Sequence, residues 1–479
     1  MDGMSPSLLA AAAWTLFLNM ASVARAGDPP YAALFDDTRV HAITVTLSAA
    51  AAESLREDPT AWVRADVEID GAVVHAVGVR HKGNSSMGIG TPKLPLKIDF
   101  GEFTKDQSFH GLKMLVLNNN FKDPSMLREK LAYDLFRELG APASRCAHAR
   151  VVLEVTGAPP TEGSASPAPK RIDLGLYTMV EHVDEVFLNE RFGTHEGNLY
   201  KLEMDPFQTR GPAMGPPGAS RSVELKTNET TNDRSRLDAL VRAVAEASAD
   251  LSVMVDFPSF ARYTALCSAL ANLDSPVGTG HNAYLYDDPK TGKFVIVPWD
   301  LNEAFGNFQM GPANELLDWS IAKPYAGRKP LFERLMGDAR FAELYRTELR
   351  RFIDGPFNPA RMNARIDELA KVIRKDAGSD TNTRRAPDEW ARSLTTDSSP
   401  PNGPGARGQQ ARGPNPMLST VLGLKPFVSR RAESIKTQLD GKSTGKVIEG
   451  RLGGPGGPPR PRGQGGPGGP PGGPPVPGD

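Results

Sequence analysis

The sequence has little cysteine, almost no net charge and no apolar run long enough to cross a membrane. Its two cysteines, Cys146 and Cys267, are too few for a disulfide-stapled scaffold and match no zinc-binding spacing. The 56 basic and 57 acidic side chains leave a formal charge of −1, so no global field favours nucleic acid or an anionic membrane as partner. The fold is therefore expected to depend on a hydrophobic core, without a transmembrane segment.

The amino terminus is typical of an export sequence. Residues 8–18 form an apolar run of eleven, shorter than the ~20 residues that span a bilayer. Ala24-Arg25-Ala26 then forms a cleavage motif, although the segment before the apolar run contains Asp2 and no Lys or Arg. We expect residues 1–26 to be a signal peptide and the mature protein to be exported to the periplasm, the cell surface or the medium.

Hydrophobic patterning predicts an α+β fold with a β-rich amino-terminal part, residues 27–190. Apolar and polar residues alternate in short runs from 40 to 100, which predicts a small antiparallel sheet with Asp70-Gly71 as a hairpin turn. An amphipathic helix is predicted over 125–139, with Ser125 at its start and Gly140 closing it. Further strands are expected at 112–118, 148–155 and 172–181.

The second part, residues 191–440, is predicted to be mainly helical. Helical periodicity covers residues 233–249, 256–272, 330–352, 359–375 and 426–440, and a β-hairpin is predicted over NAYLYDDPKTGKFVIVPWD. Residues 376–416 are polar and rich in Pro and Gly, which predicts an insertion without fixed structure. The Gly/Pro-rich tail, residues 441–479, is predicted to be disordered.

Three oxygen-bearing side chains surround the predicted hairpin. Asp274 follows a helix, Asn282 precedes the first strand and Asp300 ends the second. Carboxylate and amide oxygens suit Mg²⁺ or Mn²⁺, and phosphoryl transfer needs one carboxylate for the attacking hydroxyl and another for the metal. Asp and Asn are also common in turns for local hydrogen-bonding reasons, and that alternative stays open.

A second group of candidates lies upstream, in the turn RHKGNSS and the strand LPLKIDF. Lys97 lies inside an alternating strand pattern, which makes it a candidate phosphate anchor. The alternative is a lysine on a solvated strand face. The turn contains a glycine with adjacent hydrogen-bond donors.

Together these segments resemble the CotH kinase family, the spore coat protein H-like kinases. The resemblance covers most of residues 36–440 and rests on motifs that occur in order: RHKGNSS, KLPLKIDF, LNNNFKDPSMLREKLAYDLFRELG, GLYTMVEHVDEVFLNERFG, GNLYKLE, LANLDSPVGTGHNAYLY and VPWDLNEAFG. It implies an atypical bilobal protein-kinase fold that binds ATP. It also implies that Lys97 contacts the phosphates, that Asp274 is the catalytic base and that Asp300 binds the metal, with Asn282 beside it.

The resemblance leaves other residues less defined. Arg80 and the turn Gly83-Asn84-Ser85 would sit over the phosphates like a glycine-rich loop, with backbone N–H groups as donors. Glu181 falls where a hinge strand would meet the adenine, or it is a structural acid where the two parts join. The glutamate that pairs with the lysine remains unassigned between Glu129 and Glu138. The family usually reads WDLD, and this chain has Asn302 in the last position, which replaces an ionic metal ligand by a neutral one.

Two functions follow as hypotheses. The first is an exported kinase that transfers the γ-phosphate of ATP to Ser or Thr of a surface or envelope protein, with Mg²⁺ or Mn²⁺ as cofactor. The second is a non-catalytic surface module or pseudokinase that binds a nucleotide or a protein partner, for which Asn302 is the motivation.

Overall fold

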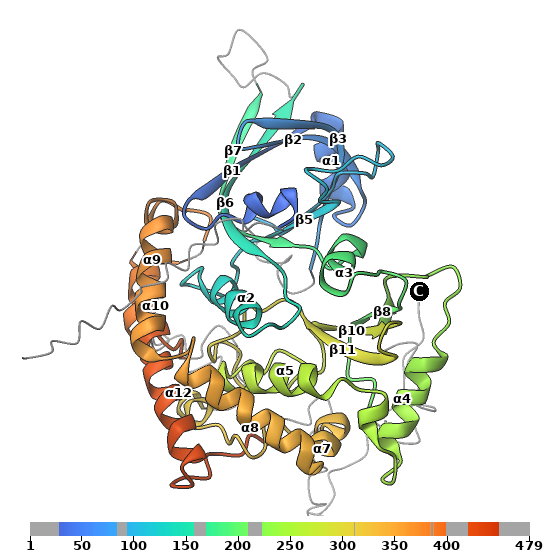
Figure 1. Cartoon of the computed structure of the whole chain (residues 1–479). Coiled ribbons are helices and arrows are strands. Elements are labelled where there is room, and N and C mark those ends of the chain that lie inside the picture. Colours follow the sequence, from blue (N-terminus) through green and yellow to red (C-terminus); the bar gives the residue numbers. More distant parts are fainter. Residues whose placement is uncertain are drawn as a thin grey trace, which may run out of the picture.

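The computed structural model describes residues 28–83, 93–157, 169–208, 223–310, 312–383, 385–386, 388–398 and 420–449. The predicted signal peptide, Asn84, Ser85 and most of the predicted tail lie outside these residues. The chain is a mixed α+β protein, as predicted, with a strand-rich part above a mainly helical part (Figure 1). The bilobal kinase fold itself stays a prediction.

Seven strands of the amino-terminal part form a closed barrel, in the order β1-β2-β3-β4-β5-β7-β6. They are β1 (Val40–Ser48), β2 (Val63–Ile69), β3 (Ala72–His81), β4 (Leu96–Asp99), β5 (Met114–Asn118), β6 (Cys146–Thr156) and β7 (Lys170–Glu181). Alternate residues face the barrel core, as Ile43, Val45 and Leu47 do on β1. The prediction of a small antiparallel sheet is incomplete, because β1 and β6 pair in parallel and close the barrel.

The predicted hairpin turn at Asp70-Gly71 is confirmed. β2 ends at Ile69 and β3 begins at Ala72, which leaves a two-residue loop. Asp70 and Gly71 have φ values of 51° and 89°. A tight hairpin turn with two positive φ angles favours Asp-Gly, because both residues tolerate that conformation.

Helix α2 (Arg128–Glu138) packs below the barrel, and Figure 1 shows it between the barrel and α5 (Phe257–Ala269). Its amino terminus is held by Asp123, whose carboxylate accepts from the Arg128 backbone N–H at 2.8 Å. At the other end, Gly140 adopts φ 81° and donates to the Arg137 carbonyl. The helix therefore ends at the glycine that the sequence indicated.

A buried histidine fixes the approach to α2 and makes stability depend on pH. His148 on β6 is hydrogen-bonded through Nε2 to the carbonyl of Met126 at 2.7 Å. Burial lowers the pKa of His148 from 6.5 to about 4. Because the folded-state pKa lies below the unfolded value, the contribution of His148 to stability is present above pH 6.5 and is lost as the pH falls to 4.

The expected size of this loss is about 3 kcal/mol of unfolding free energy between pH 6.5 and 4. A His148→Gln variant, which keeps an N–H donor but has no titrating group, should show less acid destabilisation than the wild type. Urea unfolding of both proteins at pH 7 and pH 4.5 measures the difference. Equal losses of stability in the two proteins would contradict the assignment.

The second sheet has four strands in the order β11-β10-β8-β9. The predicted hairpin is confirmed as β10 (Ala283–Asp288) and β11 (Lys293–Pro298). β8 (Leu199–Leu202) and β9 (Val223–Leu225) extend this sheet and were not predicted as strands. The sheet lies beneath the barrel and beside α3 (Glu185–Phe192) (Figure 1).

Helices surround the second sheet and continue up one side of the barrel (Figure 1). These helices are α2, α3, α5, α4 (Ser235–Ala245), η4 (Leu251–Val253), α6 (Ala313–Leu317), α7 (Pro330–Gly337), α8 (Ala339–Asp354), α9 (Pro359–Gly378), α10 (Glu389–Thr395) and α12 (Leu424–Leu439), whereas η1 (Pro30–Phe35) and α1 (Ala49–Glu57) pack on the barrel itself. The predicted helical stretch 330–352 is divided at Asp338, whose carboxylate caps α8. In the described part of the chain, no helix is both long and apolar enough to span a membrane.

The prediction that residues 376–416 lack fixed structure is wrong for the described residues up to 398. Asp380 is buried against the barrel, where it accepts from Lys93 Nζ at 2.5 Å and from the Leu176 backbone at 2.9 Å. Trp390 of α10 donates to the Ser125 carbonyl at 3.0 Å. Composition alone indicated a loop, but Asp380 finds partners on β7 and just before β4, and Trp390 finds one just before α2. Residues 399–419 lie outside the described part.

The two cysteines do not pair with each other. Cys146 begins β6 and Cys267 lies in α5, and both are buried free thiols. Burial raises the pKa of the Cys146 thiol and raises that of Cys267 to about 12. Both thiols are therefore protonated and serve as core side chains.

Candidate functional site

The β10–β11 hairpin brings Asn282 and Asp300 side by side. Ala283 pairs with Pro298 at the open end of the hairpin, and the Trp299 backbone donates to the Asn282 carbonyl at 3.2 Å. Asn282 and Asp300 both have positive φ values, 62° and 51°. Non-glycine residues in this strained region cluster at functional sites, and Asn and Asp tolerate it best.

Asp274 joins this end of the hairpin from the loop that follows α5. The Asn282 side-chain nitrogen donates to the Asp274 carbonyl at 2.9 Å and to its carboxylate at 3.1 Å. His281 lies 3.4 Å from the other carboxylate oxygen. Burial raises the pKa of Asp274; the His281 charge lowers it, and the negative charge of Asp300 raises it further. Asp274 is thus a half-buried carboxylate with increased proton affinity.

Asp300 has a side-chain oxygen atom that no described residue binds. The Asp300 backbone donates to the Tyr133 hydroxyl at 3.0 Å, which ties the hairpin to α2. Its Oδ1 atom is buried and has no hydrogen-bond partner among the described residues. A buried carboxylate oxygen without a donor fits a cation ligand, as do the amide oxygens of Asn282 and half-buried Asn302. Among the described residues no three His, Cys, Asp or Glu side chains form a metal-binding group.

A lysine that the sequence analysis did not assign faces this group from the barrel. Lys82 follows β3, and its Nζ donates to Asn118 Oδ1 at 2.6 Å. Burial lowers the pKa of Lys82, while the charges of Asp300 and Glu129 raise it. The ammonium group also lies 5.6 Å from the centre of the Trp299 ring. Lys82 therefore lies close to the end of the hairpin that carries Asp300.

Asn118 connects Lys82 to Glu129 on α2. The Asn118 side-chain nitrogen donates to both carboxylate oxygens of Glu129, at 2.8 and 3.0 Å. Glu129 is only 2% exposed, and burial, with the charge of Asp300, raises its pKa to about 8. Glu138, the other glutamate considered, is at the far end of α2 and pairs with Arg361 on α9. The contacts thus distinguish two glutamates that sequence alone did not.

Lys97 and Arg80 are direct partners across β3 and β4. Lys97 Nζ lies 3.0 Å from His182 Nε2, and burial, followed by the nearby charges of Arg80 and Lys226, lowers the pKa of Lys97 to about 8. The Arg80 guanidinium stacks over the Trp62 ring at 4.8 Å. Lys97 is half-buried rather than on a solvated strand face, so the solvated alternative does not hold.

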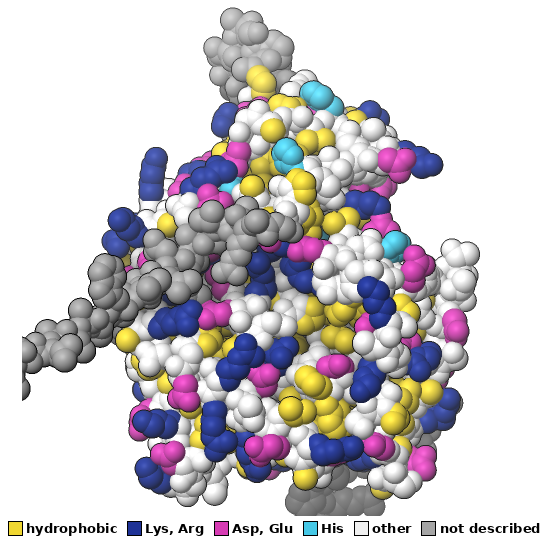
Figure 2. Space-filling view, viewed as in Figure 1, with side chains coloured by type: hydrophobic (Ala, Val, Ile, Leu, Met, Phe, Trp, Pro, Cys, Tyr) yellow, Lys and Arg dark blue, Asp and Glu magenta, His cyan; other side chains and the backbone are white. Residues whose placement is uncertain are grey.

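Lys82 and Lys97 differ from the other enclosed lysines in their partners. Among the described residues neither forms an ion pair with a carboxylate, whereas Lys93, Lys122 and Lys329 each do. Figure 2 shows Lys and Arg side chains in the hollow below the barrel. Half-buried cations without a directly paired carboxylate favour an anionic ligand at this place.

Two other predicted residues have different surroundings. Glu181 is 1% exposed and accepts from the Arg145 backbone at 2.8 Å and from the Arg191 side chain at 3.0 Å. These contacts favour the structural alternative over an adenine contact. Gly83 is exposed with φ 86°, which suits a glycine at the start of the turn. Asn84 and Ser85 lie outside the described residues.

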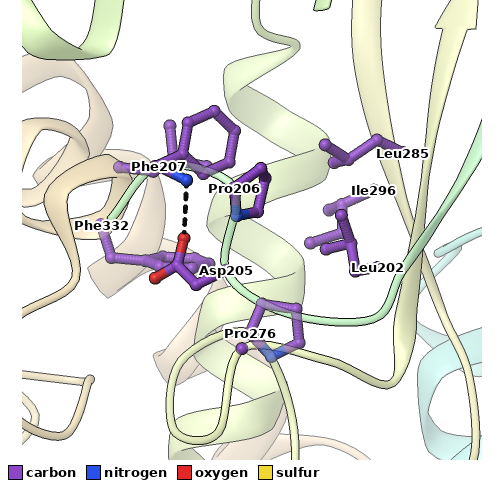
Figure 3. Close-up of a pocket in the computed structure, with 10 residues that line it drawn as sticks. Leu202, Asp205, Pro206, Phe207, Pro276, Leu285, Ile296 and Phe332 are labelled. Atoms are coloured by element: carbon purple, nitrogen blue, oxygen red, sulfur yellow. Dashed lines mark hydrogen bonds between the residues drawn. The ribbon is translucent and has the colours of Figure 1, made fainter. Parts of the chain in front are cut away.

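A small apolar pocket lies beside the loop that connects Asp274 to Asn282 (Figure 3). Pro276 and Gly280 of this loop line it together with residues of β8, β10, β11 and α7, and Asp205 accepts from the Phe207 backbone at its edge. None of the predicted site residues lines the pocket. The pocket is therefore separate from the candidate site.

Comparison with known proteins agrees with the motifs. Residues 79–397 match the family described as CotH kinase protein. The chain belongs to this CotH kinase family. All predicted site residues, from Arg80 to Asn302, fall within the matched residues.

A curated relative of this CotH family member is the inner spore coat protein H of Bacillus subtilis (strain 168). The two are 24% identical over 282 residues, which cover 57% of this chain and 71% of the relative. That protein is named for the spore coat.

Proposed function

We propose that this CotH family member is a kinase that transfers the γ-phosphate of ATP to Ser or Thr hydroxyls of a protein. One observation carries the proposal. Two half-buried lysines without carboxylate partners among the described residues reach the hairpin end. Lys82 lies near the Trp299 ring, and Lys97 is joined to it through His182, whose ring packs against Trp299. The adjacent Asp300 has a buried Oδ1 atom without a hydrogen-bond partner in the described part of the chain. A metal-bound triphosphate supplies the anion that the lysines lack and the cation that the oxygens lack.

Each side chain has a role that its surroundings support. Asp300, Asn282 and Asn302 would hold Mg²⁺ or Mn²⁺, which neutralises phosphate charge. Lys82 and Lys97 would bind the phosphates, and Arg80 and the turn at Gly83 would cover them. Asp274, with its raised pKa, would orient the acceptor hydroxyl and take its proton. The Asn282 amide keeps the Asp274 carboxylate in place.

The acceptor is expected to be a surface or envelope protein. The expected signal peptide at residues 1–26 supports export, and the curated relative is named for a spore coat. Both observations favour an acceptor outside the cytoplasm.

Asn302 favours a second candidate, a module that binds a nucleotide without turnover. An amide oxygen is a weaker ligand for a hard cation than a carboxylate. The carboxylate of neighbouring Glu303 is already bound, by Lys122 at 2.6 Å and by Asn307 at 2.9 Å. It therefore does not simply replace the missing acid.

Incubation with γ-labelled ATP and a Ser-rich acceptor, with Mg²⁺, with Mn²⁺ and with a chelator, tests the proposal. We expect label on the acceptor only when a divalent ion is present. Nucleotide-dependent thermal stabilisation without transfer would favour the second candidate. If the protein shows no nucleotide-dependent stabilisation and no phosphate transfer, both candidate functions are contradicted.

A further inference from the structure

The strand that leads into helix α2 lacks the lysine that a protein kinase has there. In protein kinases a lysine on the third strand of the amino-terminal lobe forms an ion pair with a glutamate on the following helix. Here β5 is the strand before α2, its sequence is MLVLN, and it ends in Asn118. Glu129 is on the helix, but the residue opposite it is an amide.

The positive charge reaches this place from a different strand. Lys82 follows β3, and its Nζ meets Asn118 Oδ1 at 2.6 Å while Asn118 Nδ2 meets Glu129 at 2.8 and 3.0 Å. Asn118 is 7% exposed and Glu129 is 2% exposed. A side-chain amide has one acceptor end and one donor end, so it suits a lysine on one side and a carboxylate on the other.

Glu129 positions Lys82 through Asn118 but does not neutralise its charge. A direct ion pair would place a carboxylate against the ammonium group, whereas the Asn118 amide is neutral. Lys82 therefore keeps its charge for another anion, and its neighbours Asp300 and Trp299 lie where the hairpin ends. Lys97, in contrast, is bonded to His182 at the end of β7.

We propose that Lys82 is the lysine that contacts the nucleotide phosphates nearest the metal ion, and that Asn118 and Glu129 are positioning residues that hold it there. This inference rests on the proposed function. In a protein kinase one lysine–glutamate ion pair positions the lysine. Here three residues share that task, one after β3, one at the end of β5 and one on α2. The inference also moves the main phosphate contact from Lys97 to Lys82.

Binding of ATP, with and without Mg²⁺, tests the inference without relying on turnover. Lys82→Met should weaken ATP binding by about tenfold or more, because a charge-assisted contact to phosphate is lost. Lys97→Met should have the smaller effect. Lys201→Met is a matched control, because Lys201 on β8 is half-buried nearby but is paired with Glu203 at 2.5 Å; its effect should stay below about twofold.

A double-mutant cycle tests the role of Asn118. Asn118→Leu should weaken ATP binding in the wild-type background but should have almost no effect in the Lys82→Met background, because Asn118 acts on ATP binding only by positioning Lys82. Relocation is a stricter test: Asn118→Lys in the Lys82→Met background should recover about tenfold in affinity, since the new lysine meets Glu129 directly. A packing role for Asn118 predicts no such recovery.

The outcomes separate the two proposals. This inference is overturned if Lys82→Met binds ATP as strongly as the wild type does. It is also overturned if Lys97→Met binds ATP more weakly than Lys82→Met does. In both cases the proposed function still stands. Absence of ATP binding by the folded wild type overturns both. If Asn118→Leu fails to fold, the comparison of Lys82→Met with Lys97→Met decides alone.

Discussion

Replacing Asp300 by asparagine is expected to lower phosphoryl transfer by about a thousandfold and to abolish stabilisation by Mn²⁺. The change removes one negative charge from the proposed metal ligands and leaves three amides and no carboxylate among them, and contributions of this type are worth about 4 kcal/mol in the transition state. Transfer rates with labelled ATP and melting temperatures with and without Mn²⁺ measure the two effects.

The substitution is suited to this position because the backbone can remain unchanged. Asp300 has φ 51°, which asparagine tolerates as well as aspartate does. Its backbone N–H donates to Tyr133, and this bond does not involve the side chain. Asp287→Asn is a matched control, because Asp287 is on β10 of the same hairpin and pairs with Arg236; transfer should change less than about twofold. Wild-type transfer by Asp300→Asn would contradict the metal assignment.

Replacing Lys93 by methionine is expected to lower the free energy of unfolding by about 3–5 kcal/mol. Lys93 is 2% exposed and pairs with Asp380, whose side chain is fully buried. Without Lys93 the Asp380 carboxylate is left buried without a counter-charge, although it still accepts from the Leu176 backbone. Urea unfolding of wild type and variant measures the loss.

The double variant Lys93→Met and Asp380→Asn is the control for this prediction. It removes both charges and keeps a hydrogen-bonding group at position 380, so most of the lost stability should return. Because Asp380 follows α9, the single variant should also expose the segment around 380–398 to proteolysis. Unchanged stability in Lys93→Met would show that the pair does not hold this segment to the barrel.

Neighbouring parts of the site were accessible from sequence because they depend on local structure. A hairpin brings the residues before and after it together, which placed Asn282 beside Asp300. Asp274 was accessible for the same reason, since it is eight positions from Asn282 in one loop. In the barrel, the Asp70-Gly71 turn was accessible in the same way, because its two positive φ angles favour this residue pair.

The connection of Lys82, Asn118 and Glu129 was not accessible in that way. These residues belong to three different elements of the fold. The alternating strand pattern around Lys97 predicted that lysine as the phosphate ligand instead. The position of Lys82 directly before Gly83 was the one available indication, because a lysine beside a predicted phosphate-binding turn is itself a candidate phosphate ligand. Asp380 was missed because a polar composition does not reveal a buried partner such as Lys93.

By itself, the amino-acid order determined the two hairpins, the end of α2 at Gly140 and the family, because turn chemistry, helix-end glycines and ordered motifs act over a few residues. Only the tertiary structure decided that β1 and β6 close a barrel, that Glu129 rather than Glu138 faces the site, and that residues near 380 pack on the barrel. These contacts join positions far apart in the chain, and whether an enclosed charge is paired depends on which distant group the folded chain brings to it.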